Sequence, residues 1–378
     1  MAFDKFSSRG FLLKAMIPAA VALTGAGGIG IAHADEGSTG TVYTATNAVA
    51  GNEIVMFRRA PDGSLSAAGR TATNGLGTGG GLGNQGGLVM TRNGRWLFAV
   101  NAGSNDISVF SAHRGNLTLV DRAGSGGTRP VSLTVHGDLL YVLNAGGTNN
   151  ITGFNVDDRG KLAPIPNSTR PLSAAATGPA QIEFTPDGDT LVVTEKATSK
   201  IDLYSVDDGV ASGPAVRDSN GVTPFGFAFD KRGRLIVSEA FGGAPNQAAL
   251  SSYSVSEDGN ALSVISPSVK DNQSAACWVV VTENGRYAYT TNTGSGSISG
   301  YRVARDGTLS LLGDGLTAVI GAGTGPIDAA LSKGSQFLYV LNSGIGTVSG
   351  YRVEPNGSLS PIDSVGGLAP GVNGLVAQ

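Results

Sequence analysis

A pattern of about 50 residues recurs seven times along the chain, and it constrains the fold more than any other feature. Each copy has a strand that often opens with proline, an apolar strand ending in Asn or Glu, an alternating strand with one aromatic residue, and a polar turn with glycine. Successive turn glycines are 52, 45, 49, 50, 48 and 50 residues apart. Four short strands with their turns need about 40 to 50 residues, the length of a propeller blade. The sequence therefore predicts an all-β, seven-bladed β-propeller with four-stranded blades.

The aromatic residue of the third strand is present in all seven copies. At this position in a blade a large ring packs against the neighbouring blade, so we expect a structural role for the whole set. Its members are Phe57, Phe110, Phe154, Tyr204, Tyr253, Tyr301 and Tyr351.

The two ends of the repeat region complement each other. The first copy starts at its second strand, "TVYTATN", and the chain finishes with "APGVNGLVAQ", which has the pattern of a lone first strand. We expect this last segment to join the first blade and close the ring, because closure leaves no open strand edge.

The first 34 residues have the pattern of an export signal peptide. Lys5, Arg9 and Lys14 precede an apolar stretch over residues 15–31, and "AHA" predicts cleavage after Ala34. The alternative is a membrane anchor, but the apolar run is short of the roughly 20 residues that a spanning helix needs. We expect residues 35–378 to form a single propeller domain, exported to the periplasm or secreted, by the general or a degenerate twin-arginine route.

Charge and motifs exclude several functions. The full chain has a net charge of −3, and the signal removes more basic than acidic residues, so nothing favours nucleic acid or a membrane surface. The sequence has no P-loop, dinucleotide-binding or calcium-loop motif, and we expect a monomer with a small-molecule ligand or substrate, no cofactor and no metal. Cys277, the single cysteine, has the surroundings of an inert core thiol.

Two glutamates break the pattern at the end of the second strand. Five copies place Asn there, where its side chain can bond nearby backbone, but the fourth and fifth place Glu195 and Glu239. The ends of second strands and the starts of first strands meet at one end of a propeller axis. We therefore expect both carboxylates in one solvent-filled opening, where like charges raise one pKa and favour acid–base chemistry.

Other residues are predicted at the same opening. Gln181 would polarise a carbonyl group, and Asp328 is a second candidate acid besides Glu239. Four further residues are expected to contact the ligand: Trp278, Ser132, Asn144 and Arg129.

The repeats resemble the seven-bladed lactonase-like propellers, which include bacterial 6-phosphogluconolactonases and carboxymuconate lactonizing enzymes. The resemblance spans about residues 41–378 and is carried by "LYVLN", "SGYRV", "DGTLS" and "GPAQIEFTPDGDTLVVTE". It implies the same fold and a site containing Arg, His and Glu. Only Glu195 matches that set, because Ala180 and Gln181 replace the arginine and the histidine.

Two functions remain open on this evidence. The first is hydrolysis of a small neutral lactone or ester, with Glu195 activating water. The second is non-catalytic binding of a small ligand, glycan or protein at the same opening. A third interpretation places function in long loops, such as the glycine-rich segment that begins at Gly75, which we expect to be a flexible connection.

Overall fold

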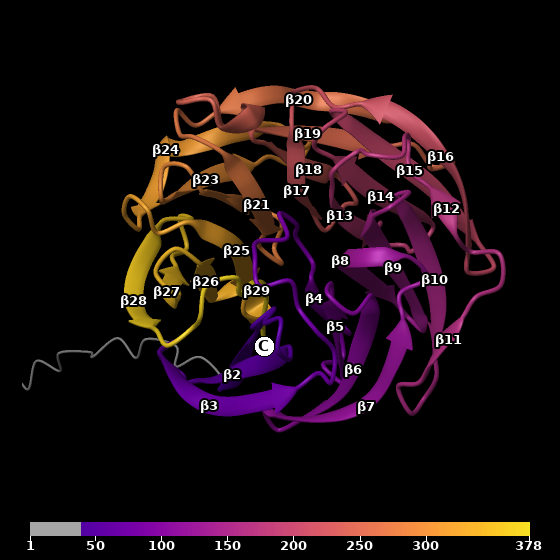
Figure 1. Cartoon of the computed structure of the whole chain (residues 1–378). Coiled ribbons are helices and arrows are strands. Elements are labelled where there is room, and N and C mark those ends of the chain that lie inside the picture. Colours follow the sequence, from indigo (N-terminus) through magenta and orange to yellow (C-terminus); the bar gives the residue numbers. More distant parts are fainter. Residues whose placement is uncertain (1–38) are drawn as a thin grey trace, which may run out of the picture. The chain divides into compact units, whose positions relative to one another are not determined.

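The computed structural model describes residues 39–378, which form a ring of seven antiparallel blades around a central axis (Figure 1). The prediction of an all-β, seven-bladed propeller is confirmed. The expected signal peptide lies outside the described residues. No helix within residues 39–378 has the length and apolar character needed to cross a membrane.

Blades I to III contain the following strands, given from the axis outward. Blade I has β29 (Asn373–Ala377), β1 (Gly40–Ala45), β2 (Glu53–Arg59) and β3 (Leu65–Ala72); blade II has β4 (Leu88–Met90), β5 (Trp96–Asn101), β6 (Asp106–His113) and β7 (Asn116–Gly124); blade III has β8 (Thr128–His136), β9 (Leu139–Gly146), β10 (Asn150–Val156) and β11 (Leu162–Pro164), with β12 (Arg170–Pro171) also paired to β10.

Blades IV to VII repeat the same order. Blade IV has β13 (Pro179–Phe184), β14 (Thr190–Glu195), β15 (Lys200–Asp207) and β16 (Val210–Asp218); blade V has β17 (Pro224–Phe229), β18 (Leu235–Glu239), β19 (Ala249–Val255) and β20 (Leu262–Lys270); blade VI has β21 (Ala276–Val281), β22 (Tyr287–Asn292), β23 (Ser297–Val303) and β24 (Leu309–Val319); blade VII has β25 (Pro326–Leu331), β26 (Phe337–Asn342), β27 (Thr347–Val353) and β28 (Leu359–Val365). Two short 3-10 helices, η1 (Phe241–Gly243) and η2 (Lys333–Ser335), lie in connections.

Burial follows position within the blade. Second strands such as β5, β14 and β26 are buried along their whole length, whereas fourth strands such as β3 expose most of their residues. The seven third-strand aromatic residues are each at most 6% exposed, which confirms their expected packing role. Each of the seven rings belongs to one of the buried apolar clusters of the propeller.

The ring is closed by the last strand, as predicted. β29 pairs antiparallel with β1, with Val42 opposite Ala377 and Thr44 opposite Leu375. The Arg59 side chain donates a hydrogen bond from Nε to the carbonyl oxygen of Gln378 at 3.0 Å. Blade I therefore joins strands from opposite ends of the described chain, and β29 covers the inner edge of β1.

Candidate functional site at the propeller mouth

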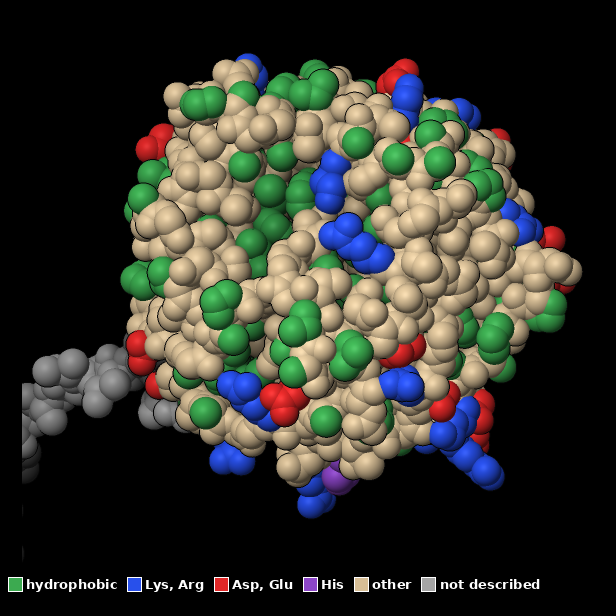
Figure 2. Space-filling view, viewed as in Figure 1, with side chains coloured by type: hydrophobic (Ala, Val, Ile, Leu, Met, Phe, Trp, Pro, Cys, Tyr) green, Lys and Arg blue, Asp and Glu red, His purple; other side chains and the backbone are tan. Residues whose placement is uncertain are grey.

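The second strands end, and the first strands begin, at one end of the axis, which we call the mouth. Figure 2 shows this face, with basic side chains beside a hollow that exposes hydrophobic side chains near its centre. Several first strands have a residue with positive φ directly before or after their first residue, including Arg129 at 54°, Thr223 at 59° and Ala275 at 59°. This conformation is unusual for residues with a Cβ, and it recurs at the entry to the first strand in more than one blade.

A segment between blades I and II, residues 75–87, crosses the mouth; we call it the axial loop (Figure 1). The Gln85 side chain pairs with both backbone groups of Val279, accepting from N at 3.1 Å and donating to O at 2.8 Å. The Asn84 side chain donates to the Val131 carbonyl and to Asn373 Oδ1. The loop thus binds the innermost strands of blades III and VI and the closing strand.

The close packing of the axial loop against blade V explains why position 226 is a glycine. A Cβ at Gly226 would lie 2.0 Å from Gln85 Oε1 and 2.6 Å from the Cys277 carbonyl oxygen, so any larger residue would displace the loop. The expectation that this segment is a flexible connection is wrong, because its side chains satisfy backbone groups of strands that face the axis.

Glu195 is fully buried at the end of β14. Its Oε1 accepts a hydrogen bond from the Ser173 backbone N at 3.0 Å, and its Oε2 accepts from the hydroxyls of Ser173 and Thr198, each at 2.5 Å. Both oxygens are therefore engaged within blade IV and the connection that leads into it.

A second carboxyl group shares this buried site. Asp202 is also fully buried, and its Oδ2 accepts from the same Ser173 N at 3.0 Å and from Tyr204 at 3.4 Å. Burial, and then the neighbouring Glu195 carboxylate, raise the pKa of Asp202 to about 8. Two buried carboxyl groups that accept from the same backbone N–H are most stable when one of them is protonated, because two adjacent negative charges repel each other.

This pair predicts a pH-dependent stability. Because the pKa of Asp202 is raised from its usual 3.8 to about 8 in the folded protein, its contribution to stability is complete below about pH 3.8, falls as pH rises above that value, and is lost by about pH 8. We expect Asp202→Asn to reduce the loss of stability between pH 5 and pH 9 by on the order of 1–3 kcal/mol, measured by thermal and chemical unfolding. Asp207→Asn, at an exposed position of the same strand, should retain the wild-type slope. An unchanged slope in Asp202→Asn would contradict the shared-proton arrangement.

Glu239 lies in a separate buried network in blade V. Its Oε1 accepts from the Gly221 N at 2.8 Å and from the Ser251 hydroxyl at 2.5 Å, and its Oε2 accepts from the Ser268 hydroxyl at 2.5 Å. The expectation that Glu195 and Glu239 share a solvent-filled opening is wrong, since each is fully buried and bonded inside its own blade. Catalytic roles for them stay predictions.

The asparagines at the same position have the structural role that their repetition suggested. Asn101, Asn292 and Asn342 each donate from Nδ2 to a serine hydroxyl seven residues later, at 2.8 Å in all three. Asn144 is fully buried and donates to the Ser125 carbonyl at 3.1 Å and to Asn150 at 2.9 Å. Its side chain is therefore held within the fold, away from the position expected for a ligand contact.

The predicted first-strand residues tie neighbouring blades together. Ser132 Oγ accepts from the Ile182 N of the next blade at 3.1 Å. Gln181 accepts from Phe227 N at 2.7 Å and donates to Phe227 O at 2.9 Å, so both ends of its amide are engaged. The Gln181 Nε2 also donates to Glu183 Oε2 at 2.9 Å, which leaves Gln181 no free donor for a substrate carbonyl.

Asp328 is buried beside the closing strand. Its Oδ1 accepts from the Ala329 N at 2.8 Å, and burial raises the pKa of Asp328 well above its usual value. A neutral carboxyl there can donate a proton, but only 3% of the residue is exposed.

Trp278 is part of an apolar cluster at the mouth, which we call the apolar wall. Trp278 packs against Phe225 with ring centroids 4.9 Å apart, and Ala180, Ala240 and Cys277 complete the cluster. Trp278 donates from Nε1 to the Asn84 carbonyl at 2.8 Å, which fixes the ring against the axial loop. Burial raises the pKa of Cys277 to about 11, in agreement with an inert thiol.

Lys196, directly after Glu195, places a cation against this wall. Its Nζ lies 4.6 Å from the Phe225 ring centroid and donates to the Gly83 carbonyl of the axial loop. Burial, with a smaller contribution from Arg129, lowers the pKa of Lys196 to about 8. No ion pair found within residues 39–378 involves Lys196 or Arg129.

The repeat pattern itself singles out Lys196. In the other six copies, the residue after the second-strand Asn or Glu is small: Ala48, Ala102, Ala145, Ala240, Thr293 and Ser343. A lysine in one copy, where the other six copies have a small residue, indicates that the mouth differs locally in this blade. The part of the chain that the structure describes holds no cluster of His, Cys, Asp or Glu suited to a metal.

A scan against protein-family models matches the family described as lactonase, 7-bladed beta-propeller, over residues 50–173 and 238–371. This chain belongs to the lactonase family. No curated protein matches this lactonase-family propeller. The interval between the two matched segments contains Ala180, Gln181, Glu195 and Lys196, so the family pattern is weakest where the mouth departs from it.

Solved structures share the fold of this lactonase-family propeller. A protein from Lactobacillus plantarum has a TM-score of 0.72, with 17% identity over 89% of this chain and 99% of that chain. A periplasmic gluconolactonase of Pseudomonas aeruginosa has a TM-score of 0.68 and 17% identity, over 89% and 98%. A protein from Bacteroides fragilis, provisionally assigned as a 6-phosphogluconolactonase, has a TM-score of 0.70 and 17% identity, over 89% and 97%.

Proposed function

We propose that this lactonase-family propeller is an exported hydrolase of small lactones or related esters, with Lys196 as the base that activates water. The supporting observation is the half-buried Lys196 amine, which has a lowered pKa, no carboxylate partner among the described residues, and an aromatic wall beside it. A base poised near the working pH is the most effective one. Export rests on the predicted signal peptide.

In this proposal, hydrolysis uses the Lys196 amine, the Arg129 guanidinium and the apolar wall beside them. The neutral Lys196 amine accepts a proton as water oxygen attacks the carbonyl carbon, and the Arg129 guanidinium stabilises the negative charge on the carbonyl oxygen. Cleavage of the ring C–O bond then leaves an alkoxide, which takes the proton back from Lys196. The apolar face of the substrate contacts the exposed edges of Phe225 and Trp278, which are 8% and 4% exposed.

Family membership supports the lactone class, and the departures from the family pattern support a neutral substrate. The arginine and histidine of the family motif are replaced by Ala180 and Gln181, and Gln181 is engaged with the next blade. With these groups absent, the mouth offers two basic side chains rather than a dedicated phosphate clamp.

The carboxylate assignment from sequence makes a competing prediction. If Glu195 is the base, with Glu239 or Asp328 as the acid, these carboxyl groups must leave their hydrogen bonds before they reach a substrate. Glu195→Gln would then lower turnover by about 100-fold. With Lys196 as base, the same variant should keep turnover within a few-fold of wild type.

The experiment is a screen of lactones and esters for hydrolysis, run beside a thermal-shift panel of the same compounds. We expect turnover of at least one lactone, little effect of Glu195→Gln or Glu239→Gln, and a parallel thermal shift. A non-catalytic ligand-binding function, favoured by the bonded state of both glutamates, predicts a thermal shift without turnover. Turnover that depends on Glu195 would overturn the assignment of Lys196 as base.

A further inference from the structure

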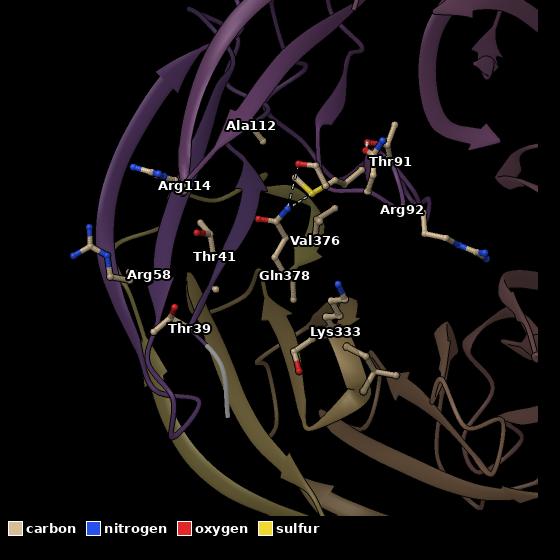
Figure 3. A pocket seen from close by; sticks show the side chains of 18 of the residues that line it. Thr39, Thr41, Arg58, Thr91, Arg92, Ala112, Arg114, Lys333, Val376 and Gln378 are labelled. Atoms are coloured by element: carbon tan, nitrogen blue, oxygen red, sulfur yellow. Dashed lines mark hydrogen bonds between the residues drawn. The ribbon is translucent and has the colours of Figure 1, made fainter. Parts of the chain in front are cut away.

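The end of the axis opposite the mouth contains a large cavity, which we call the closure cavity (Figure 3). Its volume is about 1300 Å³, and its lining comes from blades I, II, VI and VII. In six blades a hairpin joins the first and second strands at this end. Blade I has no such hairpin within the described residues, because β29 and β1 come from opposite ends of the chain. Ring closure therefore explains where the cavity lies.

Basic side chains surround this cavity. Arg58, Arg92, Arg114 and Lys333 all line it and are all exposed, and none takes part in an ion pair found within residues 39–378. Glu283 is the one acidic residue in the lining, and its Oε1 accepts a hydrogen bond from the Gly334 N at 2.9 Å. Four cations to one carboxylate is an unusual local balance in a chain with a net charge of −3.

The four basic residues lie on different sides of the cavity. In Figure 3, Arg58 and Arg114 lie on one side and Arg92 on the other, with all three side chains directed outward from Gln378, whereas Lys333 extends toward Gln378. A single small anion could contact only one or two of these groups at once. An extended ligand with several negative charges can reach more of them, and each contact to a charged group adds to its affinity.

The remaining polar lining suits a ligand rich in hydroxyl groups. Thr41, Thr91, Asn93 and Asn116 contribute hydroxyls and amides, which both donate and accept hydrogen bonds. The Gln378 amide is held in the middle by bonds from Nε2 to Met90 Sδ at 2.8 Å and to the Gly94 carbonyl at 3.4 Å. The floor is thus polar and is fixed by contacts to blade II.

We propose that the closure cavity binds an acidic oligosaccharide, a short chain of sugars that carry carboxylates. The basic side chains contact the carboxylates, and the threonine and asparagine side chains contact the sugar hydroxyls. This site is separate from the mouth and does not depend on the chemistry proposed there.

The test is calorimetric titration of the protein with an oligogalacturonate at low and at moderate salt. We expect saturable binding that weakens with salt, and we expect the double variant Arg92→Gln/Lys333→Gln to bind at least about tenfold more weakly. Lys231→Gln removes an exposed cation outside the cavity lining and should bind like wild type. Lys196→Met, altered at the mouth, should also bind like wild type.

Three results would overturn the proposal. They are an absence of saturable binding, equal binding of a neutral oligosaccharide of the same length, and unchanged affinity in the double variant with an unchanged melting temperature. Tighter binding of inorganic polyphosphate than of the oligogalacturonate would show that the cavity selects charge alone, and would reject the sugar assignment.

Discussion

Replacing Lys196 with methionine is expected to lower the turnover of a lactone substrate by about 100-fold or more, with little change in melting temperature. Methionine retains an apolar side chain of similar length that can pack beside Phe225, so the wall of the mouth is preserved. The loss would therefore report the amine. The measurement is kcat and kcat/KM on the best substrate from the screen, with unfolding followed in parallel.

Two further variants separate the roles of charge and proton transfer. Lys196→Arg keeps a cation but cannot be deprotonated, so it should be as slow as the methionine variant if the amine is the base. Lys200→Met changes a lysine of the same blade that pairs with Asp218, and it should leave turnover unchanged. Normal turnover in Lys196→Arg would show that only charge matters at this position.

The pH profile gives an independent check. Lys196 acts as a base only in its neutral form, and its pKa of about 8 lies below the usual 10.5. Turnover should therefore rise as pH increases from 7 to 9 and level off above that range. A profile that is flat over this range would exclude Lys196 as the base.

Deleting residues 370–378 is expected to abolish cooperative unfolding. This deletion removes β29, the innermost strand of blade I, together with the buried Val372 and Leu375. It exposes the inner edge of β1 and removes Asn373, which bonds the axial loop. The loss should appear in calorimetry as a broad transition or none, and in hydrogen exchange as weak protection of β1.

A milder variant controls for the effect of truncation. Leu375→Ala keeps the strand and its backbone pairing, so it should lower stability by about 2–5 kcal/mol while retaining one sharp transition. A truncated protein that melts in one sharp transition at the wild-type temperature would contradict the role of β29 in closure.

The fold could be predicted because the sequence pattern that specifies one blade lies within about 50 consecutive residues and is repeated seven times. Each blade shows its own turn glycine, apolar second strand and third-strand aromatic, and seven copies reinforce one another. Closure was also readable, since an incomplete first copy and an extra strand at the far end have one simple solution.

The site could be predicted only in part, because side-chain direction depends on contacts between distant segments. Glu195 points to Ser173, which belongs to the connection from the previous blade, and no strand pattern reveals that contact. One clue was present: serine follows Asn101 by seven residues, and Asp202 stands in the same place after Glu195. That spacing indicates a partner inside the blade, and comparison of the repeats would have directed attention to Lys196 instead.

The axial loop lies across the axis at the mouth. Because Asn84 and Gln85 bond to inner strands on several sides of the axis, the loop ties the innermost strands of blades III and VI to the closing strand. Shortening this loop would remove those ties, and the integrity of the ring would then depend more strongly on the pairing of β29 with β1.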